Sequence, residues 1–176
     1  MVENSFTIRA LGRDELSVVR DIANQTWPVS YREMIPMNQI HYMLDWMYSE
    51  TALQRQMTEE KASFFLLTLN LKEIGFASCG PTDLKDTFKL HKLYVLPGSQ
   101  RSGAGSALLH HCIDHAFAHG ARQIYLQVNR RNPALEFYQK HGFSIHREEK
   151  FDIGEGYVMD DYIMINTITT QDAIQS

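Results

Sequence analysis

Residues 90–120 read LHKLYVLPGSQRSGAGSALLHHCIDHAFAHG, which predicts a strand, a glycine-rich loop and an amphipathic helix that ends at Gly120. Small residues, Ser102 to Ser106, occupy the start of the helix and leave successive backbone N–H groups uncovered. Uncovered N–H groups and the helix dipole both favour negative charge at this point. We therefore expect the loop to bind a phosphate-bearing ligand.

Two common phosphate loops do not fit this spacing. A Walker loop needs Lys and Ser/Thr after its second glycine, whereas Ser106, Ala107 and Leu108 follow Gly105 here. A dinucleotide fingerprint needs a third small residue where Leu108 stands. The remaining segment, Gln100-Arg101-Ser102-Gly103-Ala104-Gly105 after Val95-Leu96-Pro97, resembles the Q/R-x-x-G-x-G/A pyrophosphate loop of the GCN5-related N-acetyltransferases.

The strand before the loop changes phase near His91. Apolar residues alternate at Phe88 and Leu90 and then resume at Leu93 and Val95, so the pattern slips by one residue. Such a slip predicts a β-bulge, which turns a strand and frees backbone groups; a strand buried on both faces is the alternative. The family that the loop resembles has such a bulge in its fourth strand, where that strand splays from the fifth to admit the cofactor.

Residues 129–143 read NRRNPALEFYQKHGF and are similar to a second motif of this family, N-x-x-A-x-x-F-Y-x-x-x-G-F. Asn132-Pro133 also predicts a helix start, because Asn caps helices and Pro suits their first position. The resemblance covers residues 5–166 and implies the family's α/β (mixed α+β) fold. In that fold a mostly antiparallel sheet of six to seven strands contains one parallel, splayed pair, the fourth and fifth strands, and about four helices flank it.

The remaining periodicity agrees with one domain over residues 1–176, ending in a polar tail at 167–176. Helices are expected from Asp14 over Leu16 to Ala23, over 40–47 and, after a break, over 51–60, with a loop at 26–36. The expected strands are 6–10, a hairpin of 63–69 and 74–79, 124–128, 143–147 and 159–165, with a glycine turn at 152–156 before the last.

Composition limits the partners. The chain has 176 residues, 44% of them hydrophobic, which suits one well-filled core. A net charge of -4 argues against nucleic acid as a partner. Two cysteines make no disulfide framework, no apolar run reaches membrane-spanning length, and the start of the chain lacks the regions of a signal peptide. We expect a cytoplasmic protein with no membrane partner.

The resemblance implies an acetyl-CoA-dependent enzyme without a metal. It would transfer an acetyl group to a primary amine by direct attack in a ternary complex. In this family the backbone N–H at Val95 polarises the thioester carbonyl. Tyr138 stands at the position of the acid that protonates the departing thiolate, although a tyrosine at helical spacing from Leu135 is also typical of a core residue. His91 and Glu33 are the candidate bases.

The resemblance also implies which residues bind the cofactor. They come from the strand, the loop and the second motif, and Asn132 would lie near the pantetheine arm. The set is Leu93, Tyr94, Val95, Gln100, Arg101, Ser102, Gly103, Ala104, Gly105, Ser106, Asn129, Asn132, Ala134, Phe137, Tyr138 and Lys140.

Within the family, the chain looks most like the small-molecule acetyltransferases related to the polyamine acetylating protein PaiA. The residues that carry this likeness are Tyr31 to Pro36, Leu90 to Val95 and Asp161 to Met164. A polycationic substrate would favour carboxylates around its opening, and Glu33, Asp45, Glu155 and Asp160 suit that role or a solvated surface equally.

Several alternatives remain open for the function. Amino acids, antibiotics and protein N-termini are other candidate acceptors. A peptide acetyltransferase, and a non-catalytic module that only binds acyl-CoA, are the alternatives to a small-molecule enzyme. Homodimers are common in the family.

His111, His115 and His119 recur at four-residue spacing in the predicted helix. Such spacing can place two imidazoles on one metal ion. No acidic or Cys partner is predicted beside them, and histidines near a helix C-terminus are favoured by the helix dipole. We therefore predict no metal site.

Overall fold

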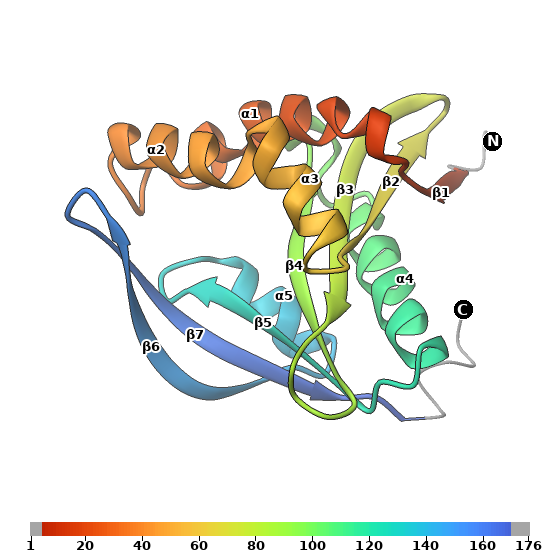
Figure 1. Ribbon diagram of the computed structural model, residues 1–176. Helices are drawn as coiled ribbons and strands as arrows, with labels where there is room; N and C mark the ends of the chain where they lie inside the picture. The colour runs from red at the N-terminus through yellow and green to blue at the C-terminus, as the bar shows by residue number, and fades with distance from the viewer. Residues whose placement is uncertain (1–4, 170–176) are drawn as a thin grey trace.

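The computed structural model describes residues 5–169, in which a seven-stranded sheet carries helices on both faces (Figure 1). The strand order is β1-β2-β3-β4-β5-β7-β6. The strands are β1 Phe6–Ala10, β2 Ser63–Leu69, β3 Lys72–Pro81, β4 Thr87–Val95, β5 Gln123–Asn129, β6 Ser144–Gly154 and β7 Tyr157–Thr167. Neighbouring strands are antiparallel except β4 and β5, which confirms the predicted sheet with one parallel pair.

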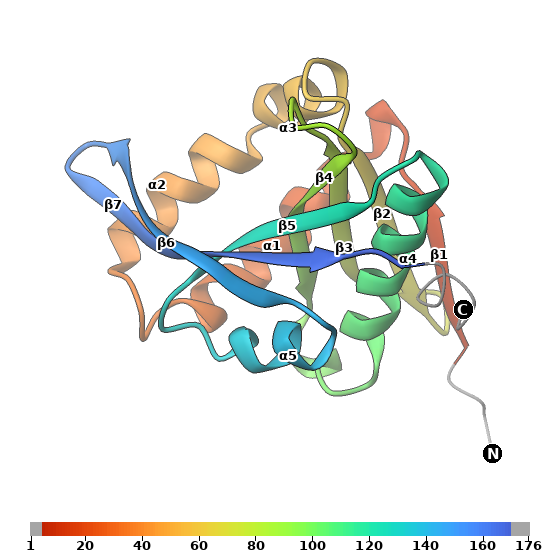
Figure 2. The ribbon, with the colours of Figure 1, turned by 90° about the horizontal axis from the view of Figure 1, so that it is seen from below.

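Five α-helices flank the sheet, with short 3-10 turns at η1 Arg13–Glu15 and η2 Pro97–Ser99. Helices α1, α2 and α3 cover one face, and α4 and α5 cover the other (Figures 1 and 2). Each face has its own apolar core, because alternate strand residues point to opposite faces. The helices are α1 Ser17–Ser30, α2 Met37–Tyr48, α3 Glu50–Thr58, α4 Ala104–Ala118 and α5 Ala134–Lys140.

The first helix begins later and ends later than expected. Gly12 N–H donates to the Glu15 carboxylate at 2.8 Å and caps the turn η1, so α1 begins after Leu16 instead of at Asp14. The predicted loop at 26–36 was wrong for its first residues, because α1 continues through Pro28 to Ser30. Burial of Trp27 explains this, since packing a large aromatic side chain outweighs a proline in the last turn.

The last two strands are longer than their apolar patterns indicate. Residues 144–150 of β6 are mostly exposed, so they show no alternation, yet they pair with β7. The turn between the strands narrows to Glu155 and its two flanking glycines. At the C-terminal end, Ile168 is buried, and residues 170–176 of the predicted tail lie outside the described residues.

The predicted bulge is confirmed at His91. Ser78 of β3 pairs with Lys92 and Cys79 pairs with Leu90, which leaves His91 without an opposite residue. Pairing between β4 and β5 covers only Thr87–Lys89 and Gln123–Tyr125. Beyond these three residues the parallel strands diverge, and the divergence creates the opening in which the candidate site lies.

Candidate active site

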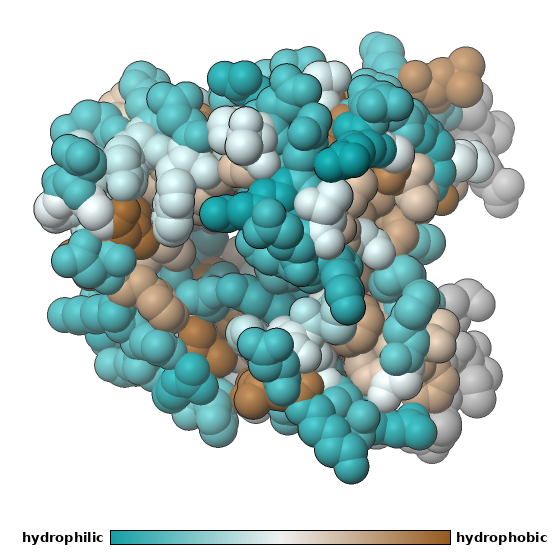
Figure 3. Space-filling model, viewed as in Figure 1, coloured by the Kyte–Doolittle hydropathy of each residue, from teal (hydrophilic) through white to brown (hydrophobic). Residues whose placement is uncertain are grey.

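A cavity of about 980 Å³ occupies the opening between the strands. It runs from the loop before α4, past β4 and β5, to the helices α1–α3 and the hairpin of β6 and β7. Figure 3 shows the molecule hollowed between α1–α3 and this hairpin. The expected site residues that line the cavity are His91, Leu93, Tyr94, Val95, Gln100, Arg101, Gly103, Gly105, Ser106, Asn129, Asn132, Ala134, Phe137 and Tyr138.

Four of the expected residues lie outside its lining. Ser102 donates its hydroxyl to the Ser99 carbonyl at 2.6 Å, and Ala104 is buried beneath the loop. Lys140 is exposed at the end of α5. Glu33 has a side chain that is 87% exposed and pairs with Arg32 at 3.4 Å.

The glycine-rich loop has the geometry of an anion cradle. Gly103 adopts φ +90 at the N-cap of α4, a conformation that side chains disfavour, and no side chain caps the helix. The first N–H groups of α4 therefore have no partner from a capping side chain at the point where the helix dipole favours negative charge. This arrangement fits a diphosphate group.

The N–H group of Val95 points toward the divergence of the strands. Leu96 N–H donates to the Ile74 carbonyl of β3 at 2.8 Å, and successive N–H groups of a strand point to opposite sides. The Val95 N–H is therefore directed away from β3, toward β5. On the same side, Gln100 Nε2 donates to the Val95 carbonyl at 3.4 Å and links this peptide to the loop.

Tyr138 of α5 is buried, with 9% of its surface exposed, and it lines the cavity. Burial raises its pKa well above the usual 10, and the nearby Tyr31 and Cys112 raise it further. Its hydroxyl therefore stays protonated at neutral pH and is available as a hydrogen-bond donor. Near it, Asn132 Oδ1 accepts from the Ala134 N–H at 2.9 Å. The N-cap residue of α5 is Pro133 and not the predicted Asn132, so the helix begins one residue later than expected, at Ala134.

Of the two candidate bases, His91 lines the cavity. Burial lowers its pKa to about 3, and the charges of Lys89 and Lys92 act in the same direction. Its Nε2 atom is buried and has no hydrogen-bond partner. His91 is therefore an uncharged imidazole at neutral pH and a weak base.

Lys92 is a functional candidate that the sequence analysis missed. Its side chain is 5% exposed, lines the cavity and places Nζ 4.7 Å from the centre of the Tyr48 ring. Burial lowers its pKa to about 7; Glu60 opposes this shift and Lys89 adds to it. The apolar pattern gave no signal for it, because Lys92 lies on the face of β4 opposite to Leu93 and Val95.

Aromatic side chains form the wall opposite the loop. Tyr31 follows α1 and its hydroxyl lies 3.0 Å from that of Tyr94 on β4. The Trp27 ring lies 4.5 Å from Tyr31 and 5.7 Å from Tyr48, measured between centroids. Trp27, Tyr31 and Tyr94 line the cavity, and we name these three residues the aromatic wall. Such rings offer faces that attract cations.

Three carboxylates, Glu60, Asp152 and Asp161, also line the cavity. Burial raises the pKa of Asp161 to about 6; Asp160 adds to this and Lys89 opposes it. Of the four acidic residues expected at the opening, Asp160 alone lines either of the two cavities described here.

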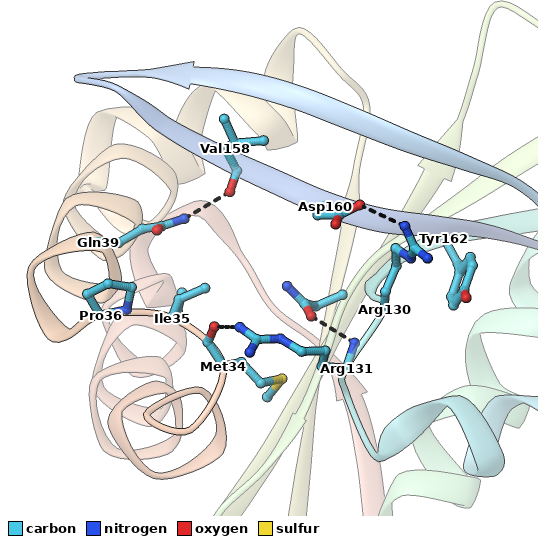
Figure 4. Close-up of a pocket in the computed structure, with 10 residues that line it drawn as sticks. Met34, Ile35, Pro36, Gln39, Arg130, Arg131, Val158, Asp160 and Tyr162 are labelled. Carbon is cyan, nitrogen blue, oxygen red and sulfur yellow. Dashed lines mark hydrogen bonds and ion pairs between the residues drawn. The ribbon is translucent and has the colours of Figure 1, made fainter.

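A second cavity of about 580 Å³ adjoins the first (Figure 4). Its walls are tied together by hydrogen bonds from Gln39 Nε2 to the Val158 carbonyl, at 3.1 Å, and from Arg131 to the Met34 carbonyl. Asp160 pairs with Arg130 at 3.6 Å. These contacts join the segment around the start of α2 to the loop after β5 and to β7. Gln39 and Val158 also line the large cavity.

His111 and His115 of α4, and His119 directly after the helix, pack around aromatic rings. His111 and His115 lie edge-on to Phe65, and His115 contacts His119 with ring centroids 4.2 Å apart. Within residues 5–169, no group of three or more His, Cys, Asp or Glu side chains is arranged to hold a metal ion. In the same part of the chain, no helix is both long and apolar enough to cross a membrane.

Comparison with known proteins adds three findings. Residues 19–143 match the model of the Acetyltransferase (GNAT) family. An uncharacterized N-acetyltransferase of Mycobacterium tuberculosis is 30% identical over 156 residues, which are 88% of this chain and 97% of that protein. Two solved structures share the fold. PaiA N-acetyltransferase from Thermoplasma acidophilum, in complex with coenzyme A, has a TM-score of 0.77 at 23% identity, covering 93% of this chain and 99% of that one. A ribosomal-protein-alanine N-acetyltransferase from Escherichia coli has a TM-score of 0.71 at 25% identity, covering 94% and 95%.

Proposed function

The chain belongs to the acetyltransferase (GNAT) family, and on that basis we propose that it transfers the acetyl group of acetyl-CoA to a primary amine of a small molecule in a ternary complex. The observation that carries this proposal is the opening between β4 and β5. There the Val95 N–H, the Tyr138 hydroxyl and the uncapped start of α4 all face one cavity.

The residues that line the cavity have separate roles in the proposed reaction. The loop around Gly103 holds the diphosphate through backbone N–H groups. Val95 N–H stabilises the negative charge that develops on the thioester oxygen, since a fixed dipole needs little reorganisation. Tyr138 donates a hydrogen bond to the departing sulfur, and its raised pKa keeps that donor in place at neutral pH.

The acceptor occupies the opposite end, between the aromatic wall and the hairpin of β6 and β7. The contacts of Gln39 and Arg131 close this end and favour a small acceptor over a long peptide. Glu60, Asp152, Asp161 and the aromatic wall favour an acceptor with more than one positive charge. A polyamine fits both features, and we propose this substrate class.

Two further proposals complete this assignment. Cys79 and Cys112 are both buried free thiols, which suits the reducing cytoplasm as the site of action. A homodimer is the proposed assembly, and the mass in solution tests it.

The test is release of free thiol from acetyl-CoA in the presence of spermidine, spermine, diamines, amino acids, aminoglycosides and short peptides. Saturable release with spermidine or spermine is the expected result. Release only with peptides would refute the small-molecule acceptor and would point to an activity like that of the Escherichia coli relative. Tight binding of CoA without release of free thiol in the presence of any of these amines would refute the proposed enzymatic activity and favour a module that only binds acyl-CoA.

A further inference from the structure

A chain of hydrogen bonds links the phosphate loop to the end of α5. Ser106 Oγ lies 3.0 Å from His141 Nε2, and His141 Nδ1 lies 2.7 Å from the Phe137 carbonyl oxygen. A carbonyl oxygen only accepts, so Nδ1 carries a proton. In the uncharged imidazole Nε2 then has none, and it accepts the hydroxyl proton of Ser106. The Ser106 hydroxyl is therefore directed at His141 and not into the cavity that Ser106 lines.

A diphosphate bound in the loop requires the Ser106 hydroxyl to donate to a phosphate oxygen instead of to His141. Phosphate oxygens accept hydrogen bonds, and Ser106 has one proton to donate. If His141 gains a second proton, its Nε2–H donates to Ser106 Oγ, and the Ser106 hydroxyl becomes free to donate to the phosphate. The proton comes from solvent and forms the Nε2–H bond, and no other covalent bond forms or breaks.

We propose that His141 is a positioning residue for the diphosphate of acetyl-CoA, taking up a proton as the ligand binds and thereby turning the Ser106 hydroxyl toward a phosphate oxygen. The inference rests on the proposed function. The imidazolium also lies directly after the last residue of α5, where the carbonyl ends of a helix favour a cation.

The residues around His141 include two rings, a lysine and an amide. The His110 ring of α4 lies 5.4 Å away and the Phe137 ring 4.4 Å away, and Lys140 precedes it in the chain. On the β7 side, Asn166 donates to the His141 carbonyl at 3.1 Å.

The experiment measures proton uptake together with affinity. Binding of CoA is followed by titration calorimetry at pH 7.5 in buffers that differ in ionisation enthalpy. The wild-type protein should take up more protons per CoA than His141→Leu. Ser106→Ala should weaken CoA binding about fivefold to tenfold, the value of one hydrogen bond. His141→Leu leaves the Ser106 hydroxyl free to donate, so it should keep affinity for CoA and lose the extra proton uptake. The double variant should bind CoA as Ser106→Ala does, because His141 acts through Ser106.

Three controls make the result specific. His110→Leu removes a neighbouring imidazole that no hydrogen bond joins to Ser106, and it should leave proton uptake unchanged. Pantetheine lacks the diphosphate and should bind wild type and variants alike. His141→Gln keeps an amide donor for Ser106, so it should retain affinity and lose the extra proton uptake, which serves as the test if His141→Leu does not fold.

The outcomes separate the two proposals. Failure of the wild-type protein to bind CoA would refute the proposed function itself. Normal CoA binding with equal proton uptake in wild type, His141→Leu and His141→Gln would overturn the role of His141 and leave the acetyltransferase assignment standing.

Discussion

Replacing Lys92 with methionine should make the folded protein more stable at neutral pH. Lys92 is buried, and burial lowers its pKa from 10.5 to about 7. At 1.36 kcal/mol per pH unit, holding the charged amine there costs about 5 kcal/mol relative to the unfolded chain. The contact of Nζ with the Tyr48 ring, worth about 2 kcal/mol when desolvated, is lost in the variant. The expected net gain is about 3 kcal/mol.

The pH dependence of the stability difference distinguishes the cost of the buried charge from an improvement in packing. Below pH 7 the amine is protonated in both states, so the full cost applies. Between pH 7 and 10.5 the folded protein holds fewer protons than the unfolded chain, and the cost shrinks as the pH rises. The advantage of the methionine variant should therefore narrow by about 3 kcal/mol between pH 6 and pH 9.5.

Urea unfolding of both proteins at these two pH values measures the difference. Lys92→Arg is the matched control, because a guanidinium remains charged throughout and should lower stability at both pH values. Lys72→Met, at an exposed position of β3, should change stability little. Equal stability of wild type and Lys92→Met, or a difference that does not change with pH, would refute the reasoning.

Three other changes test the site. Tyr138→Phe should lower kcat about tenfold to a hundredfold with little effect on the Kd for CoA, measured by thiol release and calorimetry; equal kcat would remove Tyr138 from the reaction. Gly103→Glu should abolish CoA binding by calorimetry, because its backbone has φ +90 and a carboxylate would repel the diphosphate; unchanged affinity would contradict the phosphate loop. Asp161→Asn should stabilise the protein more at pH 7.5 than at pH 4.5 in urea unfolding, since the raised pKa of about 6 makes ionisation costly only as the pH rises; a gain that is equal at both values would exclude this cause.

The alternation of apolar residues in β4 predicted the bulge, because the buried residues before and after the bulge are apolar. The change of phase at His91 could be identified in the sequence, and the pairing of β3 with β4 confirms the bulge there. The same slip puts Lys92 on the face of β4 opposite to Leu93 and Val95, so the apolar pattern did not predict that Lys92 is buried. A sequence pattern seldom predicts a buried lysine, since charged residues are almost never fully buried unless paired.

Other features were invisible because they depend on contacts between distant segments. Two prolines suggested that residues 26–36 form a loop, yet Trp27 packs against Tyr48 and keeps α1 helical to Ser30. The contact between Ser106 and His141 joins residues 35 positions apart and exists only because α5 packs beside the start of α4. The sequence analysis placed Ser106 at the cofactor and made no prediction for His141, because motif spacing carries no information on which side chains meet.

Lys92 is also a candidate for the base that accepts a proton from the acceptor amine. An amine whose pKa lies near 7 is partly uncharged at neutral pH and can accept a proton, which the incoming ammonium group must lose before it attacks. His91, with its pKa of about 3, does this less well. We therefore expect Lys92→Met to be more stable and less active, with kcat/KM lowered and its rise between pH 6 and 8 lost. A variant that is more stable and equally active at every pH would show that the buried charge has no part in the reaction.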